Sequence, residues 1–210
     1  MVKRAVTITY RVESSEVQSL CDSDEQLSLV ICRYGDLQYS LHTDEFSFFI
    51  ETIIGQMLSN KAADAITARL YSLCGGEPSL PKIMELAQSA IRGIGLSDQK
   101  VSYIKGFASL LNSNPSYFEE LPKLDEGEII RQLISIRGIG TWSAKMYLIF
   151  VLNRLDVLPF EDGAFLRAYK LLYDTDDVKP LSITKRCEPW KPYSSLAARY
   201  LYRALDSGLI

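Results

Sequence analysis

The stretch Leu133-Ile-Ser-Ile-Arg-Gly-Ile-Gly-Thr-Trp-Ser-Ala-Lys145 carries the clearest structural signal in the sequence. The apolar positions up to Ile136 predict one helix, and a second helix is expected to begin at Thr141. Between them, Gly138 and Gly140 enclose a single aliphatic residue. Glycine adopts the backbone angles that a tight turn demands more easily than other residues do. The stretch therefore predicts two helices joined by a hairpin.

The hairpin turn is also a candidate binding site for a phosphate group. Its glycines have no side chains to keep a ligand away from the backbone amides, and the amino end of the following helix carries a partial positive charge. A lysine one helical turn further on is expected to reach the same phosphate. The residues predicted to make these contacts are Gly138, Ile139, Gly140, Thr141 and Lys145.

The core of this hairpin occurs twice in the chain. Ile136-Arg-Gly-Ile-Gly140 is preceded by an identical Ile91-Arg-Gly-Ile-Gly95, and a lysine follows five residues after each copy, at Lys100 and Lys145. Two copies are too few for a repeat protein. For the first copy, the sequence leaves open whether it is a second ligand site or simply a good turn between two helices.

Composition and charge limit the class of protein. The chain has 210 residues, of which 47% are hydrophobic and 23% charged, as is typical of a soluble globular protein. The net charge is −3, so overall charge does not attract the chain to DNA or membranes. The charge is uneven, however, because the first 60 residues contain 4 basic and 9 acidic residues. Residues 61–210 are therefore compatible with a local basic surface.

The cysteines and the single histidine, His42, argue against a bound metal. Cys21, Cys32, Cys74 and Cys187 have none of the close spacings of zinc or iron–sulfur ligands. We expect no metal and no cofactor. Neither a run of about 18 apolar residues nor a signal peptide is recognisable, so we expect a cytoplasmic protein without membrane association.

The periodicity along the rest of the chain predicts an all-α fold. A short strand or extended arm is expected at Val6–Val12. Either Asp24 or Ser23 is suited to cap the first helix, and Asp44 is suited to cap the next. Helices are expected near residues 24–35, 44–58, 61–73, 83–91, 98–111, 126–136, 141–152, 162–173 and 194–204.

The hairpin resembles the helix–hairpin–helix motif of DNA-binding proteins, and other segments extend the match. Val157-Leu-Pro-Phe-Glu-Asp-Gly163 places Asp162 22 residues after Gly140, which is similar to the arrangement in the helix–hairpin–helix DNA glycosylase superfamily. Glu188-Pro-Trp-Lys-Pro-Tyr-Ser194 resembles the W-[RK]-P-x-R-[ST] signature of the bacterial 3-methyladenine DNA glycosylase II group, except that Ser194 stands in place of arginine. Phe46–Ser59 resembles the family's first large-lobe helix and the loop after it.

This resemblance covers roughly residues 22–206 and implies a fold of two helical lobes with a short N-terminal extended arm. On that basis we divide the chain into an arm (1–20), one lobe formed by 21–44 plus 155–210, and a second lobe of 45–154. The second lobe carries the helix–hairpin–helix motif (133–145).

The resemblance also implies an enzyme subtype. Relatives that cleave the DNA backbone as well carry a Schiff-base lysine two positions after the second hairpin glycine, where this chain has Trp142. This favours a monofunctional hydrolase. Asp162 then takes the role of the carboxylate that stabilises an oxocarbenium-like sugar and orients the attacking water. Two alternatives stay open: Asp162 as a helix cap, and Glu161 as the catalytic carboxylate.

Base flipping defines the remaining predicted site residues. An extruded base leaves a hole in the duplex, and the resemblance places Met57, with Gln56 beside it, where a side chain fills that hole. Trp142, Tyr202 and Met146 match the positions of the base pocket, whose aromatic faces attract a cationic alkylated base. For Met57 the alternative is an ordinary core methionine, and for Trp142 and Tyr202 it is a buried aromatic residue.

Together these features predict a monofunctional DNA glycosylase that flips out and excises alkylated purines such as 3-methyladenine from double-stranded DNA, acting as a monomer. The alternatives are a non-catalytic helix–hairpin–helix DNA-binding module, a bifunctional glycosylase/lyase for oxidised bases, and a helical interaction protein with no role on DNA.

Overall fold

The computed structural model describes residues 6–210, which form two compact units. Unit 1 combines the chain up to Thr43 with the chain from Lys145 onward, and unit 2 comprises Asp44–Ala144. The division falls inside one helix, α10 (Thr141–Phe150), whereas the sequence placed it after residue 154. A continuous helix carries no loop or composition signal at such a division, so a sequence pattern does not reveal it.

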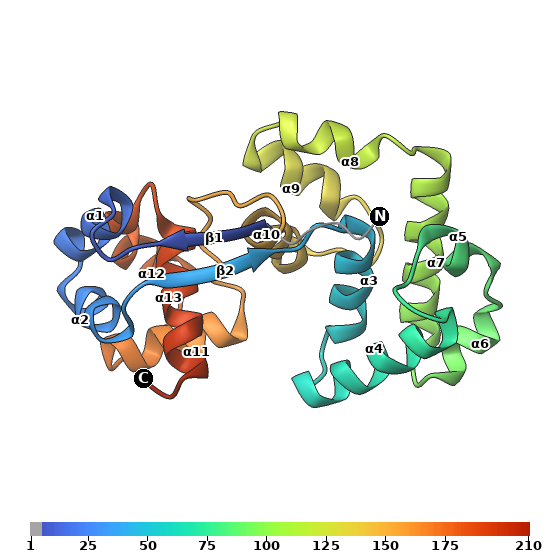
Figure 1. The fold of residues 1–210 in the computed structure, drawn as a ribbon, viewed down its shortest axis with the longest axis horizontal. Coiled ribbons are helices and arrows are strands. Elements are labelled where there is room, and N and C mark those ends of the chain that lie inside the picture. Colours follow the sequence, from blue (N-terminus) through green and yellow to red (C-terminus); the bar gives the residue numbers. More distant parts are fainter. Residues whose placement is uncertain (1–5) are drawn as a thin grey trace. The chain divides into compact units, whose positions relative to one another are not determined.

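Unit 1 begins with a two-stranded antiparallel sheet. β1 (Val6–Tyr10) pairs with β2 (Leu37–Leu41), as Figure 1 shows. In this register Tyr10 lies opposite Leu37. β2 was not predicted, because its alternation of buried and exposed residues lasts only five residues between two helices. The helices α1 (Ser15–Ser23) and α2 (Glu25–Tyr34) connect the strands. The described part of the predicted arm is therefore a strand and the start of a helix, while residues 1–5 lie outside the described residues.

The carboxylate of Asp24 organises the core of unit 1. It caps α2 by accepting a 3.0 Å hydrogen bond from the Leu27 amide, and it also accepts bonds from Trp190 Nε1 at 2.9 Å and from the hydroxyl of Tyr173. Trp190, from the signature-like tail, is fully buried. Its role is thus structural. The remaining helices of unit 1 are α11 (Gly163–Tyr173), α12 (Pro180–Arg186) and α13 (Ser194–Asp206), and α2 packs against both α11 and α13.

Unit 2 is built around the apolar helix α3 (Glu45–Gly55), which Asp44 caps through the amides of Phe46 and Ser47. The rings of Phe49 and Phe107 meet edge to face with centroids 5.4 Å apart. The other helices are α4 (Asn60–Cys74), α5 (Leu80–Glu85), α6 (Gln88–Gly93), α7 (Asp98–Ser113), α8 (Tyr117–Glu120) and α9 (Glu126–Ile134), followed by the first turn of α10.

The predicted all-α class is confirmed, with the small sheet as an addition. The caps at Asp24 and Asp44 lie where they were expected. The single helix expected at 83–91 is two helices, because the backbone is extended at Leu86 and Ala87. α1, α8 and α12 were not predicted. Within residues 6–210, no helix has the length and apolar character needed to cross a membrane.

Candidate active site and DNA interface

The two glycines of the hairpin in unit 2 have different roles. Gly138 adopts φ +96°, and a Cβ atom built there would lie 2.4 Å from the Tyr103 ring. Ile139 is buried, and its amide donates a 3.0 Å hydrogen bond to the Ile136 carbonyl. Gly140 is exposed, and nothing lies within 4 Å of a Cβ placed on it. Gly138 thus shapes the turn, whereas Gly140 keeps the backbone open just before the amino end of α10.

The earlier copy of the pentapeptide forms a different turn. There α6 continues through Gly93, the positive φ of +108° falls on Gly95, and α7 begins three residues later at Asp98. In the hairpin, α10 begins directly after Gly140. The first copy is therefore a turn between two helices, and identical residues adopt different backbones in different tertiary surroundings.

Lys100, which follows the first copy, acts on a neighbouring helix end. Its Nζ donates hydrogen bonds of 2.7 Å to the carbonyl of Ile54 and 2.6 Å to that of Gln56, and burial lowers the pKa of this lysine. These are carbonyls at the carboxyl end of α3, which a lysine is suited to satisfy. Lys100 therefore anchors the loop between α3 and α4.

This loop presents Met57 to solvent. Met57 has φ +58° and is fully exposed. A non-glycine residue in the left-handed region is uncommon and marks a conformation that the surroundings impose. Gln56, beside it, donates a 2.8 Å hydrogen bond to the Gly138 carbonyl. The alternative that Met57 is a core residue is wrong, and its role as the residue that fills the DNA gap stays a prediction.

Asp162 stands at the start of α11 in unit 1. Its Oδ1 accepts a 2.8 Å hydrogen bond from the Phe165 amide, so it caps the helix, as one alternative had proposed. It also lines a cavity. Capping occupies one face of a carboxylate and leaves further acceptor capacity, so the two roles are compatible.

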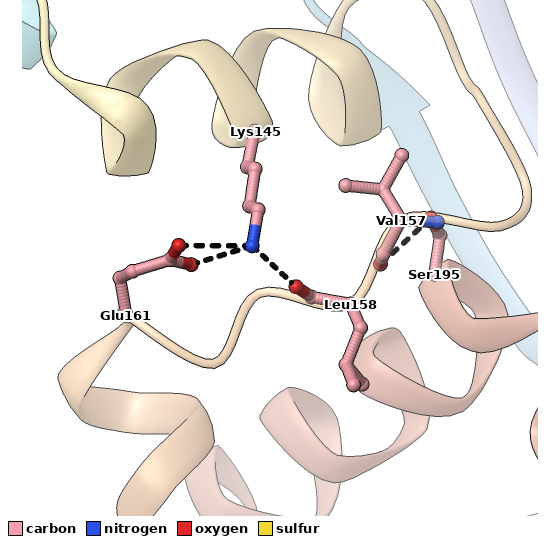
Figure 2. Close-up of polar contacts among 5 residues, drawn as sticks. All are labelled: Lys145, Val157, Leu158, Glu161 and Ser195. Atoms are coloured by element: carbon pink, nitrogen blue, oxygen red, sulfur yellow. Dashed lines mark hydrogen bonds and ion pairs between the residues drawn. The ribbon is translucent and has the colours of Figure 1, made fainter. Parts of the chain in front are cut away.

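The prediction that Lys145 contacts a DNA phosphate is contradicted. Figure 2 shows its ammonium turned toward the loop before α11, where Nζ lies 2.9 and 2.8 Å from the two carboxylate oxygens of Glu161 and 3.0 Å from the Leu158 carbonyl. Its side chain is only 11% exposed. Because the group is buried and paired, it has neither the access nor the free charge that a phosphate contact needs.

The same loop is attached to α13. Val157 donates a 2.9 Å hydrogen bond to Ser195 Oγ, and that hydroxyl in turn donates to the Val157 carbonyl at 3.2 Å (Figure 2). Ser194 Oγ donates a 2.5 Å bond to Asp156. Ser194 is the position that departs from the glycosylase II signature, and here it binds the chain that leads to Asp162.

A cavity of about 370 Å³ lies in unit 1 beside Asp162. Two predicted pocket residues, Met146 and Tyr202, line it together with Asp162. Burial, and secondly the negative charge of Asp162, raise the pKa of Tyr202 well above its ordinary value. Other lining residues include Leu37, Tyr39, Phe150, Ala164, Arg199 and Arg203. Trp142, the third predicted pocket residue, is half-buried in the part of α10 that belongs to unit 2, and its role stays a prediction.

Sequence reasoning missed Tyr39 and Arg199. The guanidinium of Arg199 lies 3.6 Å from the Tyr39 ring centroid and 4.8 Å from that of Phe150, and it donates a 2.5 Å bond to the Ile149 carbonyl. Burial lowers the pKa of Arg199 to about 10, so it is still charged at neutral pH. Its position three residues before Tyr202, on the same face of a helix, was the available signal. Tyr39 was missed together with β2.

Comparison with known proteins agrees with this architecture. A family model described as HhH-GPD superfamily base excision DNA repair protein matches residues 50–192. DNA-3-methyladenine glycosylase 1 of Schizosaccharomyces pombe is 32% identical over 165 residues, which cover 76% of this chain and 72% of that protein. A putative DNA-3-methyladenine glycosylase of Bacillus subtilis is 27% identical over 193 residues, covering 88% of this chain and 67% of that protein.

Solved structures show the same similarity. The DNA-3-methyladenine glycosidase of Bacillus halodurans has a TM-score of 0.83 and 32% identity, covering 96% of this chain and 94% of that one. The S. pombe 3-methyladenine DNA glycosylase in complex with abasic DNA has a TM-score of 0.79 and 26% identity, covering 92% and 97%. The two-lobed helix–hairpin–helix glycosylase fold expected from the sequence is thereby confirmed.

Proposed function

Because the chain belongs to the HhH-GPD superfamily of base excision DNA repair proteins, we propose that it is a monofunctional DNA glycosylase. Its substrates are alkylated purines such as 3-methyladenine in double-stranded DNA. The names of the relatives at 32% identity support this substrate class. We further propose that it acts as a monomer inside the cell, on chromosomal DNA.

The observation that carries the proposal is the position of Asp162 at a cavity that Tyr202 and Met146 also line. Glu161, the alternative carboxylate, is held by Lys145 through both of its oxygens. This supports Asp162 as the catalytic group. An aromatic wall and a carboxylate suit a flipped, cationic base attached to a sugar that develops positive charge.

In this mechanism the bond between C1′ of the sugar and the base nitrogen breaks, and its electron pair leaves with the base. An alkylated purine is cationic before cleavage and neutral after it, so it departs without a separate acid. The Asp162 carboxylate stabilises the oxocarbenium-like sugar and orients a water whose oxygen bonds to C1′. The proton of that water passes to the carboxylate and then to solvent.

The DNA contacts proposed for unit 2 rest on different observations. The open backbone at Gly140 and the exposed Thr141 at the amino end of α10 suit a phosphate. Met57, fully exposed, suits the space that a flipped nucleotide leaves. Trp142 stands where lyase relatives carry lysine, which supports hydrolysis without strand cleavage.

The test is single-turnover release of 3-methyladenine from duplex DNA by Asp162→Asn. Asparagine still caps a helix, so the fold is expected to persist while the charge is removed. We expect release to fall by about 10² or more, the scale for losing one preorganised electrostatic group. Affinity for duplex that contains an abasic analogue should change little. The control is Asp125→Asn, a cap on α9 that accepts a 2.8 Å bond from the Glu128 amide.

Undiminished release by Asp162→Asn would overturn its catalytic role. If the wild-type protein binds alkylated duplex but releases no base, the non-catalytic binding module is the correct function instead.

A further inference from the structure

The ammonium of Lys145 holds the loop that leads to Asp162 at several points. It contacts both carboxylate oxygens of Glu161 and the carbonyl of Leu158, at 2.8–3.0 Å. It also lies 3.6 Å from the centroid of the Phe160 ring. All of these partners fall within the four residues before Asp162. One side chain on α10 therefore fixes the path of this short segment.

The surroundings make this contact stronger than a surface ion pair. The Lys145 and Glu161 side chains are 11% and 27% exposed, whereas the ion pair of Lys123 with Glu120 has exposures of 64% and 63%. Charged hydrogen bonds shielded from water are screened less, and removing one partner leaves the other charge buried and uncompensated. Breaking the pair is therefore expected to disturb this segment more than breaking an exposed ion pair disturbs its surroundings.

The loop is also fixed before and after this contact. Ser195 exchanges hydrogen bonds with the backbone of Val157, and Asp162 itself caps α11 through the Phe165 amide. Between these two points Lys145 supplies the attachment to α10. A displacement of about 1 Å in a catalytic group can reduce a rate 10²-fold.

We infer that Lys145 and Glu161 are positioning residues for the Asp162 carboxylate. Neither contacts the DNA; together they set where the carboxylate stands at the cavity. This inference rests on the proposed function, because it concerns the residue assigned to catalysis there.

The experiment compares Lys145→Met, Glu161→Gln and the double variant. For each, the single-turnover rate of 3-methyladenine release and the affinity for abasic-analogue duplex are measured at several salt concentrations. Lys145→Met is expected to slow release by about 10- to 10²-fold. Affinity and its salt dependence should stay near the wild-type values. The double variant should be no slower than the slower single variant, since both residues act through one contact.

Two further variants make the result specific. Lys145→Arg keeps the charge and is expected to recover most of the rate, which a general loss of stability would not explain. Lys123→Met, which breaks the exposed pair with Glu120, is the control and should leave both rate and affinity unchanged. Far-ultraviolet circular dichroism and urea unfolding establish that each variant is folded. If Lys145→Met does not fold, the release rates of Glu161→Gln and Lys145→Arg are compared instead. Glu161→Gln keeps the bond from Lys145 to Leu158.

Three outcomes would overturn the inference. A uniform loss of affinity with a salt slope lower by about one would return Lys145 to a phosphate contact. Additive effects of the two substitutions would show that the residues act independently. An unchanged release rate in folded Lys145→Met would show that the contact does not position Asp162. Failure of the wild-type protein to release any alkylated base would instead count against the proposed function.

Discussion

The side-chain amide of Gln56 donates a hydrogen bond of 2.8 Å to the carbonyl oxygen of Gly138. The loop that exposes Met57 is therefore attached to the hairpin turn, although the two are far apart in the sequence. Lys100 supports the same loop by binding the carbonyls of Ile54 and Gln56. Within unit 2, the two segments predicted to contact DNA thus form one connected structure.

Met57→Ala should slow base release from fully paired duplex more than release from a substrate whose damaged base is already unpaired. A side chain that fills the gap stabilises the flipped state, and an unpaired base needs less of that stabilisation. Single-turnover release from the two substrates measures the difference. Met84→Ala, at a methionine that is 38% exposed elsewhere in unit 2, is the control. Equal slowing on both substrates would argue against this role for Met57.

Lys100→Met should weaken the order of the loop and reproduce part of the Met57→Ala effect. Loss of the lysine leaves two carbonyls at the end of α3 without their donor, at a cost of about 1–3 kcal/mol in the free energy of unfolding. Lys105 offers a matched control, because its Nζ binds the carbonyls of Ile83 and Met84 at 2.6 and 3.0 Å. Lys105→Met should have a similar stability cost in urea unfolding without the selective loss on paired duplex. Identical DNA phenotypes in both variants would refute the assignment.

Alanine at the two hairpin glycines should separate folding from DNA binding. Gly138→Ala meets the Tyr103 ring and a φ of +96°, so it is expected to lower the free energy of unfolding by about 1–3 kcal/mol. Gly140→Ala has open space and should leave stability nearly unchanged. We expect it to weaken binding to all duplexes, because its methyl group stands between a phosphate and the backbone. Unfolding curves measure the stability of both variants, and titrations with duplex DNA measure their affinity. Tight binding by Gly140→Ala would place the phosphate site elsewhere.

Product DNA should contain intact abasic sites that break only after treatment with alkali. Trp142 cannot form the imine that a lysine forms with the sugar aldehyde, so borohydride should trap no covalent complex between the protein and DNA. Denaturing gels before and after alkali, with a borohydride lane, provide the measurement. A trapped complex that disappears when one lysine is substituted would establish lyase chemistry instead.

Local signals in the sequence were sufficient for the long helices and for two of their caps, but not for the short helices α1, α8 and α12. Asp24 and Asp44 were recognisable because a helix cap depends on a side chain and amides two or three residues away. The hairpin was recognisable because its turn lies within consecutive residues, whereas the spacing to Asp162 was recognised through its resemblance to a known family. These features of the sequence predict the class of fold and the class of enzyme.

Contacts between distant residues decided the rest. Lys145 was expected to bind phosphate, yet it pairs with Glu161, which is 16 residues away in the chain. The two identical pentapeptides form different turns, one of them with its Gly138 against Tyr103. Arg199 lines the cavity and contacts the ring of Tyr39, which lies on β2, a strand that was not predicted. In each case the energy of the side chain depends on which partner the fold brings within a few ångströms. The spacing of residues along the chain does not indicate that partner.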